Sequence, residues 1–162
     1  MQTLRPGSLA PNFTLVGQDG SIFTLGDSLK RQPVALVFYP MDGSPNCNQL
    51  LCRINQDVDE FEAAGITIVG VNYAEPDVHK HYAARKFLRL PLLSDQQFRV
   101  AAAYDSLFHI GPIKVIRYSV AGIGQDSRII YYQRGRPSNQ QIIQSMQAAR
   151  PPSGMAVDAP SA

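Results

Sequence analysis

The chain has 162 residues, 44% of them hydrophobic, which is enough for one compact domain with an apolar core. Its formal net charge is only +2 and its 15 Lys and Arg residues are scattered, so we expect no binding of nucleic acid. Because no stretch approaches the roughly 20 apolar residues of a membrane span, and the N-terminus lacks an apolar signal region, we expect no membrane association and a cytoplasmic location.

The N-terminal third predicts a hairpin and then a buried strand. Two short β-prone runs, residues 13–16 and 21–24, flank the turn sequence Gln18-Asp19-Gly20. The run PVALVFYP, residues 33–40, is apolar without alternation, which is typical of a strand covered on both faces. It is predicted to end at Pro40, because proline donates no hydrogen bond to a sheet.

A helix and a second buried strand are expected next. Apolar residues recur at three- and four-residue spacings over residues 45–64, which predicts one helix closed by Gly65. The segment GITIVGVN, residues 65–72, then reads as another buried strand. Strand, helix and strand together form a βαβ unit, whose crossover is right-handed in nearly all cases.

The middle of the chain predicts shorter elements. Helices are expected over residues 79–87 and 95–103, on either side of the extended segment LPLLSD at 90–95. The runs VIRYSVA (115–121) and RIIYYQR (128–134) predict an antiparallel pair, because a polar, glycine-containing segment separates them.

The C-terminal part completes the fold prediction. Ser138 is expected to cap a last helix, which buries Ile142, Ile143 and Met146. We expect residues 1–149 to form one domain and residues 150–162, rich in Pro, Ala and Ser, to be a disordered tail. The order of elements is that of an α/β, thioredoxin-like fold: a central mixed β-sheet flanked by helices, with an N-terminal β-hairpin extension.

The only two cysteines, Cys47 and Cys52, lie at the predicted junction between strand and helix. Open α/β sheets place their sites at such junctions. Ser44 and Pro45 are predicted as the N-cap and the first helical residue, so Cys47 falls in the first turn, where free N–H groups and the helix dipole favour a thiolate. A buried structural cysteine behind an ordinary capping serine is the alternative that this pattern alone leaves open.

The segment FYPMDGSPNCNQLLC resembles the active-site segment of the peroxiredoxins, whose pattern is Pro, three residues, Thr or Ser, two residues and Cys. Pro40, Ser44 and Cys47 match that pattern, and a second cysteine five residues later is similar to the bacterioferritin comigratory protein or peroxiredoxin Q class. The segments PGSLAPNFTL, LPLLSD and VIRYSVA also resemble the family in the same order. The chain departs from it at Ser44, Asn46, Gln49 and Leu50, which affects the expected rate and substrate preference more than the reaction type.

The resemblance implies a role for each site residue. Cys47 is the nucleophile that attacks a hydroperoxide, and Arg117 supplies a positive charge that favours the thiolate and helps to hold the peroxide. The Ser44 hydroxyl and the first-turn N–H groups hydrogen-bond the reacting oxygens. Asn46 is among the substrate-binding residues, and Pro40 shields the thiolate from water. Neither a cofactor nor a metal is implied.

Cys52 is implied as the resolving residue. It would convert the Cys47 sulfenic acid into an intramolecular disulfide, which a thioredoxin or a similar dithiol reductant would then reduce. In an intact α-helix, positions five apart have Cα atoms about 8.7 Å from each other, whereas disulfides rarely tolerate more than about 7 Å. The helix must therefore unwind locally. The resemblance separately implies that the protein acts as a monomer.

Two other functions remain open on the sequence. A thiol-disulfide oxidoreductase of the same fold would carry Cys-x-x-Cys here, whereas the spacing in this chain has four intervening residues. A redox-sensing module without turnover would use the same thiols. His79 and His81 do not share a helix face, and we expect both to be solvated surface residues rather than zinc ligands.

Overall fold

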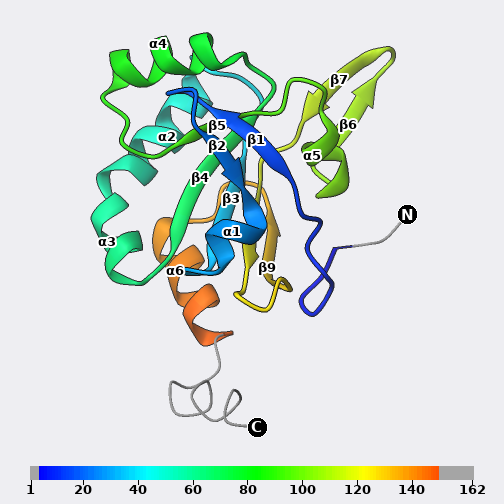
Figure 1. The fold of residues 1–162 in the computed structure, drawn as a ribbon. Helices are drawn as coiled ribbons and strands as arrows, with labels where there is room; N and C mark the ends of the chain where they lie inside the picture. Colours follow the sequence, from blue (N-terminus) through cyan, green and yellow to red (C-terminus); the bar gives the residue numbers. More distant parts are fainter. Residues whose placement is uncertain (1–3, 150–162) are drawn as a thin grey trace, which may run out of the picture.

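The computed structural model describes residues 4–149, and its centre is one seven-stranded mixed sheet (Figure 1). Its strands are β1 (Thr14–Gly17), β2 (Ile22–Thr24), β3 (Val34–Phe38), β4 (Thr67–Asn72), β5 (Leu92–Ser94), β8 (Ser119–Ile123) and β9 (Ile129–Arg134). They lie in the order β2-β1-β5-β4-β3-β8-β9, with β5, β4 and β3 parallel and the remaining pairs antiparallel.

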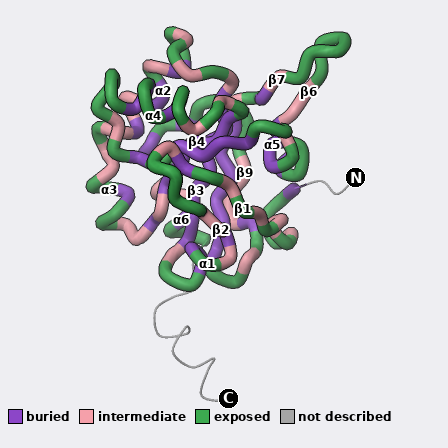
Figure 2. Tube along the Cα trace, turned by 45° about the horizontal axis from the view of Figure 1, so that its top comes forward, coloured by how far each residue is buried: buried purple, intermediate pink, exposed green. Residues whose placement is uncertain are grey.

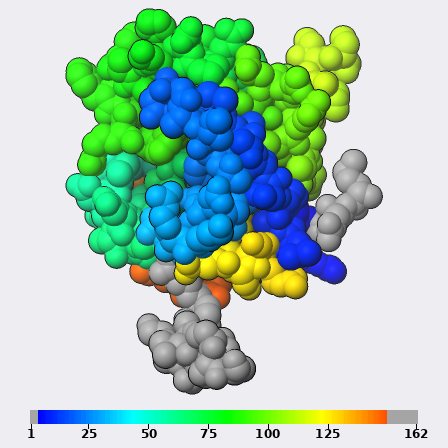
Figure 3. Space-filling view, in the orientation of Figure 1, coloured from blue at the N-terminus to red at the C-terminus, as the bar shows by residue number. Residues whose placement is uncertain are grey.

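Helices cover the sheet, and a separate hairpin projects from it. The helices are α1 (Leu25–Leu29), α2 (Pro45–Gln56), α3 (Val58–Ala63), α4 (Pro76–Lys86), α5 (Arg99–Ala103) and α6 (Asn139–Ala148). Strands β6 (Leu107–Ile110) and β7 (Ile113–Ile116) form a two-stranded hairpin that protrudes at the upper right of Figures 1 and 3. No helix of residues 4–149 is long and apolar enough to cross a membrane.

Strand β3 separates two apolar cores. Ala35 and Val37 pack into the core formed with α2, α3, α4 and α6, whereas Leu36 and Phe38 pack into the core formed with α1 and α5. All five residues of the strand are buried, and the central strands are the most deeply buried part of the tube in Figure 2. The prediction of a strand covered on both faces is therefore confirmed.

Most predicted elements are present. The N-terminal hairpin is formed by β1 and β2, the βαβ unit by β3, α2, α3 and β4, and the antiparallel pair by β8 and β9. Ser138 caps α6, because its hydroxyl accepts a hydrogen bond from the Gln141 N–H at 3.1 Å. The predicted tail at 150–162 lies outside the described residues.

The prediction of a single helix over residues 45–64 is wrong in one respect, because the structure has two helices there. Asp57 leaves the helical region (φ −109°, ψ 19°) between α2 and α3. Its carboxylate accepts a hydrogen bond of 2.8 Å from the Asn139 side chain, which ties this point to the start of α6. Gly65 follows α3 with a positive φ of 69°, which agrees with its predicted role as helix terminator.

The boundaries of the later helices also differ from the prediction. Helix α4 starts at Pro76, three residues earlier than expected, because proline suits the first helical position. Helix α5 starts late, at Arg99, because the Asp95 carboxylate accepts hydrogen bonds from the Val100 and Ala101 N–H groups and thus caps it.

The strand predicted over residues 115–121 is interrupted. Residues Arg117 and Tyr118 separate β7 from β8, and the Arg117 N–H donates to the Ser106 carbonyl at 2.7 Å rather than to a sheet partner. Helix α1 and the β6–β7 hairpin were not predicted at all.

Candidate active site

The junction between β3 and α2 holds the predicted cysteine. Ser44 adopts extended dihedrals (φ −70°, ψ 150°) directly before α2, which begins at Pro45. Cys47 consequently lies in the first helical turn, as predicted, where the backbone N–H groups have no partner within the helix. Its side chain is completely buried. The helix end favours a thiolate and burial opposes one, so the polar partner of the sulfur is decisive.

That partner is Tyr118, a residue that sequence reasoning missed. Its hydroxyl lies 3.1 Å from the Cys47 sulfur. Burial, the hydrogen bond with Cys47 and the charge of the cysteine raise the pKa of Tyr118 to about 12, while Arg136 and Ser44 oppose the shift. At neutral pH the phenol is therefore protonated, so it is able to donate a hydrogen bond to the Cys47 sulfur.

The other predicted residues of this junction, Ser44, Pro40 and Asn46, differ in burial and in contacts. Ser44 is half-buried, and its hydroxyl makes no capping hydrogen bond to the helix. It lies instead close enough to the Tyr118 hydroxyl to lower the pKa of that group. Pro40 is half-buried and Asn46 is exposed on the first turn of α2. The structure thus brings Ser44, Cys47 and Tyr118 together.

Arg117 is not part of this cluster of contacts. It is exposed, and its guanidinium carbon lies 4.8 Å from the centre of the Phe108 ring, in the β6–β7 hairpin. Among residues 4–149, the hydrogen bond of the Cys47 sulfur goes to Tyr118 and not to Arg117. A cation over an aromatic face is attracted to the ring, which holds Arg117 toward the hairpin.

This arrangement predicts the pH dependence of thiol reactivity. Tyr118→Phe removes a hydrogen bond to a charged group, so the pH midpoint of Cys47 alkylation should rise by about one unit. The measurement is the rate of iodoacetamide alkylation against pH, with the Cys52→Ser substitution present so that one thiol reacts.

Arg117→Ala in the same background is the matched comparison. Its shift should be smaller, because the Arg117 guanidinium lies over Phe108 and the hydrogen bond of the sulfur goes to Tyr118. A shift in Arg117→Ala with none in Tyr118→Phe would instead support the role that the peroxiredoxin resemblance implies for the arginine.

The second thiol, Cys52, lies on the same helix as Cys47. Helix α2 is continuous from Pro45 to Gln56, Cys52 is half-buried, and both cysteines are free. Helical geometry sets their Cα atoms about 8.7 Å apart, which is beyond the usual reach of a disulfide. In the conformation described, the two thiols therefore cannot be joined.

A buried hydrogen-bond network supports the loop that leads to Cys47. His79 belongs to this network, so the prediction that it is a solvated surface residue is wrong. The His79 side chain is completely buried rather than solvated, with Nδ1 2.6 Å from the Asp42 carboxylate and Nε2 3.1 Å from the Leu93 carbonyl. Asp42 also accepts from the Tyr39 hydroxyl at 2.6 Å and from the Asn72 amide at 3.0 Å. His81 is exposed, as predicted.

One signal in the sequence could have located His79. It precedes Tyr82 and Ala83 by three and four positions, and these three residues form the buried face of α4. Tyr82 extends the support, because its hydroxyl donates to the Asn48 side chain at 2.6 Å and Asn48 donates to the Gly43 carbonyl at 3.3 Å. The first turn of α2 is thus held by its own loop and by α4.

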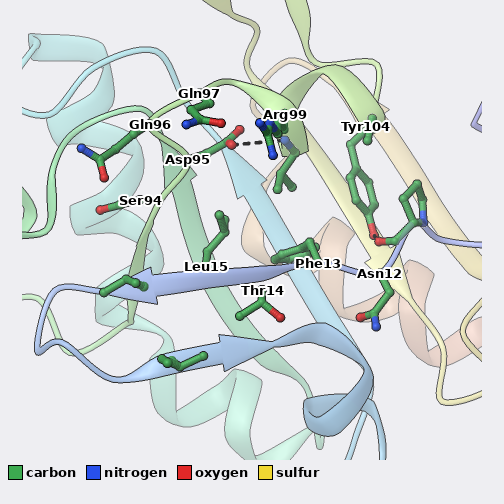
Figure 4. A pocket seen from close by; sticks show the side chains of 15 residues that line it. Asn12, Phe13, Thr14, Leu15, Ser94, Asp95, Gln96, Gln97, Arg99 and Tyr104 are labelled. Atoms are coloured by element: carbon green, nitrogen blue, oxygen red, sulfur yellow. Dashed lines mark hydrogen bonds between the residues drawn. The ribbon is translucent and has the colours of Figure 1, made fainter.

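A cavity of about 590 Å³ lies in the other layer of the molecule (Figure 4). Its walls include Leu15 of β1 with the preceding Phe13, and Val100 of α5 with the following Tyr104. These residues belong to the core of α1 and α5, whereas Cys47 belongs to the opposite core. The cavity therefore does not contribute to the thiol site.

Comparison with known sequences gives a consistent set of relatives. The sequence profile of the AhpC/TSA family matches residues 6–127. The chain is 37% identical to the chloroplastic Peroxiredoxin Q of Populus jackii over 90 residues, which are 56% of this chain and 42% of that protein. It is 32% identical to Peroxiredoxin Bcp of Escherichia coli (strain K12) over 104 residues, 64% of this chain and 66% of that protein. The matched stretch thus spans less than half of the plant relative.

Solved structures confirm the predicted thioredoxin-like fold. The peroxidoxin BcpB of Mycobacterium tuberculosis superposes with a TM-score of 0.84 at 23% identity, over 91% of this chain and 99% of that one. A cysteine-to-serine mutant of Xylella fastidiosa PrxQ superposes with a TM-score of 0.82 at 23% identity, over 91% and 98% of the two chains.

Proposed function

The chain belongs to the AhpC/TSA family, and from this premise we propose that it is a thiol-dependent peroxidase of the peroxiredoxin Q type, which reduces hydrogen peroxide and organic hydroperoxides. The observation that carries the proposal is the Cys47 thiol, at the start of α2 and 3.1 Å from a protonated tyrosine hydroxyl. This arrangement gives the sulfur a hydrogen-bond donor at a helix start, and the thiolate is the reactive nucleophile of cysteine chemistry.

In the first step the Cys47 thiolate attacks the terminal oxygen of the hydroperoxide. A sulfur–oxygen bond forms, the oxygen–oxygen bond breaks, and the departing oxygen takes a proton and leaves as an alcohol or as water. Tyr118, Ser44 and the first-turn N–H groups, including that of Asn46, donate hydrogen bonds to the reacting oxygens as negative charge moves onto them. Pro40 limits access of water from the loop side.

In the second step the Cys52 thiol attacks the sulfur of the Cys47 sulfenic acid. The disulfide forms and water leaves, which prevents further oxidation of Cys47. A dithiol reductant of the thioredoxin type then supplies two electrons through thiol–disulfide exchange and restores both thiols. We propose that this cycle runs in a monomer in the cytoplasm.

The test is consumption of hydrogen peroxide by the purified chain with thioredoxin, thioredoxin reductase and NADPH. Continuous turnover supports a peroxidase. Oxidation of the two thiols by a single equivalent of peroxide, without turnover by any dithiol, would favour the redox-sensing alternative. Reduction of disulfide substrates without peroxide consumption would favour the oxidoreductase alternative.

Formation of the disulfide should unwind the first half of α2. After one equivalent of peroxide, the amides of residues 49–53 should exchange with deuterium faster than in the reduced protein. The amides of β3 and β4 should stay protected, because both strands are buried in the sheet.

The structure also predicts where unwinding stops. The Arg53 carbonyl accepts from the Asn139 side chain at 2.9 Å, and the Asn55 side chain bonds the Phe87 carbonyl and the Arg89 N–H at 3.0 and 2.6 Å. Oxidised Cys52→Ser, which cannot form the disulfide, is the control and should exchange like the reduced protein. Equal protection in both redox states, with the disulfide verified by mass spectrometry, would contradict unwinding.

A further inference from the structure

Phe87, at the end of α4, combines two features that do not favour folding. Its side chain is 84% exposed, the highest fraction among the large hydrophobic residues of the described part of the chain. Its backbone is left-handed, with φ 55° and ψ 41°. A single exposed apolar residue is ordinary on a protein surface, but a bulky residue in left-handed backbone is rare, because its Cβ lies too close to a carbonyl oxygen. Phe87 therefore carries backbone strain without burying its ring.

The hydrogen bonds that end α4 impose this backbone. The Leu88 N–H donates to the Ala83 carbonyl at 2.9 Å. The Phe87 N–H donates to the Ala84 carbonyl at 3.4 Å, and the two bonds together form the Schellman motif. Asn55 of α2 fixes the same turn by donating to the Phe87 carbonyl at 3.0 Å. The left-handed position of this motif is usually glycine, which has no Cβ, so glycine would suit the fold better than phenylalanine.

This turn lies beside the part of α2 that carries Cys52. Asn55, which holds the turn, follows Cys52 by three positions and therefore shares its side of the helix. Tyr82 of α4 lies near the same thiol, because burial and then the charges of Asp42 and Cys52 raise the pKa of this tyrosine. The proposed disulfide of Cys52 would consequently form on the side of α2 that faces α4, next to Phe87.

The last turn of α4 is also basic. Arg85 and Lys86 are exposed, and neither forms an ion pair within residues 4–149. Positive charge at the C-terminal end favours a helix by itself, so these two residues alone indicate no partner. Together with the strained, exposed ring of Phe87 they form a surface, here called the α4 tip, that is complementary to an apolar patch with acidic groups around it.

We propose that the α4 tip is the docking surface for the protein dithiol that reduces the Cys47–Cys52 disulfide, and that Phe87 inserts into an apolar patch beside the reactive cysteine of that partner. The partner is a protein of the thioredoxin type, whose acidic groups pair with Arg85 and Lys86. Its thiolate attacks one sulfur of the disulfide, so that a mixed disulfide forms and a thiolate of this chain leaves. The second thiol of the partner then attacks the mixed disulfide and releases the reduced chain. This inference rests on the proposed peroxidase function and adds the place at which its reductant binds.

The experiment compares two reductants in the peroxide assay: thioredoxin with its reductase, and dithiothreitol, which is too small to use a docking surface. The quantity measured is the ratio of the kcat/KM values for thioredoxin and for dithiothreitol, because a ratio cancels changes in the disulfide itself. Phe87→Ala should lower this ratio about tenfold, the loss expected for one aromatic residue that anchors an interface. Arg85→Gln combined with Lys86→Gln should lower it several-fold, and that loss should shrink as salt is added.

Phe87→Gly separates docking from folding. It should lower the ratio as Phe87→Ala does, and it should raise the thermal unfolding midpoint by about 2–4 °C, because glycine relieves the left-handed backbone. Ser127→Gly is the matched control: Ser127 is also left-handed (φ 65°), but it lies in the β8–β9 turn, at the opposite end of the molecule from α4 (Figure 1). This control should raise the midpoint and keep the native ratio. A lower midpoint in Phe87→Gly would show that the ring supports the fold and would overturn the proposal.

Two results with Phe87→Ala would also contradict docking of a reductant. One is an unchanged ratio. The other is the loss of a dimer that the native protein forms in sedimentation, which would make a second copy of the chain the occupant of the α4 tip.

A single-turnover measurement separates this proposal from the proposed function. If no peroxide is consumed, the peroxidase function fails, and the disulfide is formed with the thiol oxidant diamide instead. The rate at which thioredoxin reduces that disulfide should still fall about tenfold in Phe87→Ala. An equal rate in both proteins, or no disulfide for thioredoxin to reduce, would overturn the docking proposal.

Discussion

Cys47→Ser is expected to reduce peroxide consumption to the background rate. Serine keeps the shape of the site but supplies no thiolate, so the sulfur–oxygen bond of the first step cannot form. Cys52→Ser should behave differently: it should consume one equivalent of peroxide per chain and then stop when thioredoxin is the reductant, because no disulfide is formed. The measurements are NADPH oxidation in the coupled assay and the mass of the intact chain after one equivalent of peroxide.

The two variants control for each other, since both remove one thiol from the same helix. Mass spectrometry should show an oxygen added to Cys47 in the Cys52→Ser protein. A burst of consumption in Cys47→Ser, with none in Cys52→Ser, would reverse the assigned roles. The thermal unfolding midpoints of both variants should be close to that of the native protein. Loss of the fold would then be excluded as the cause of the lost activity.

Asp42→Ala should cause a large loss of stability, about 3–5 kcal/mol, because each buried polar group left without a partner costs about 1–3 kcal/mol. The substitution leaves the His79 ring, the Tyr39 hydroxyl and the Asn72 amide without their shared acceptor, all in buried positions. The free energy of unfolding is measured by urea denaturation at neutral pH. Because this network supports the loop before Cys47, peroxide reduction should fall as well.

Asp59→Ala is the matched control for the stability prediction. Asp59 also pairs with a basic side chain, Arg89, at 2.9 Å, but both side chains are largely exposed. Exposed pairs contribute less than about 1 kcal/mol, so this variant should unfold almost like the native protein. If the two aspartate variants lose equal stability, then water replaces Asp42 at little cost and the network is not a strong stabilising element.

Local patterns in the sequence were sufficient for the centre of the fold. The unbroken apolar run of β3 can only be covered on both faces, and the spacing of apolar residues in α2 defines its buried side. Short elements such as α1 and the β6–β7 hairpin lack such a signal, because four or five residues are far fewer than the roughly 11–18 over which a hydrophobic period is read. The break at Asp57 depends on Asn139, which is remote in sequence.

The same distinction applies to the site. The positions of Ser44 and Cys47 follow from capping rules that act over a few residues, and the structure agrees with them. Tyr118 reaches Cys47 from 71 positions along the chain, and Asp42 and His79 are 37 positions apart. Only the folded sheet and helices bring these pairs together, so no local pattern indicates them.

The side-chain bonds at the end of α2 have a kinetic consequence for the reductive step. Starting a helix from a disordered segment is unfavourable, because several residues must be fixed before one hydrogen bond forms. Here the bonds of Asn139 and Asn55 keep the last turn of α2 in place, and Asp57 still donates to the Ile54 carbonyl at 3.0 Å. After reduction the helix can grow from this preformed turn, at roughly a nanosecond per residue. Rewinding is then far faster than enzymatic turnovers of about 10 per second, so recovery of the reduced conformation should not limit the rate of the proposed cycle.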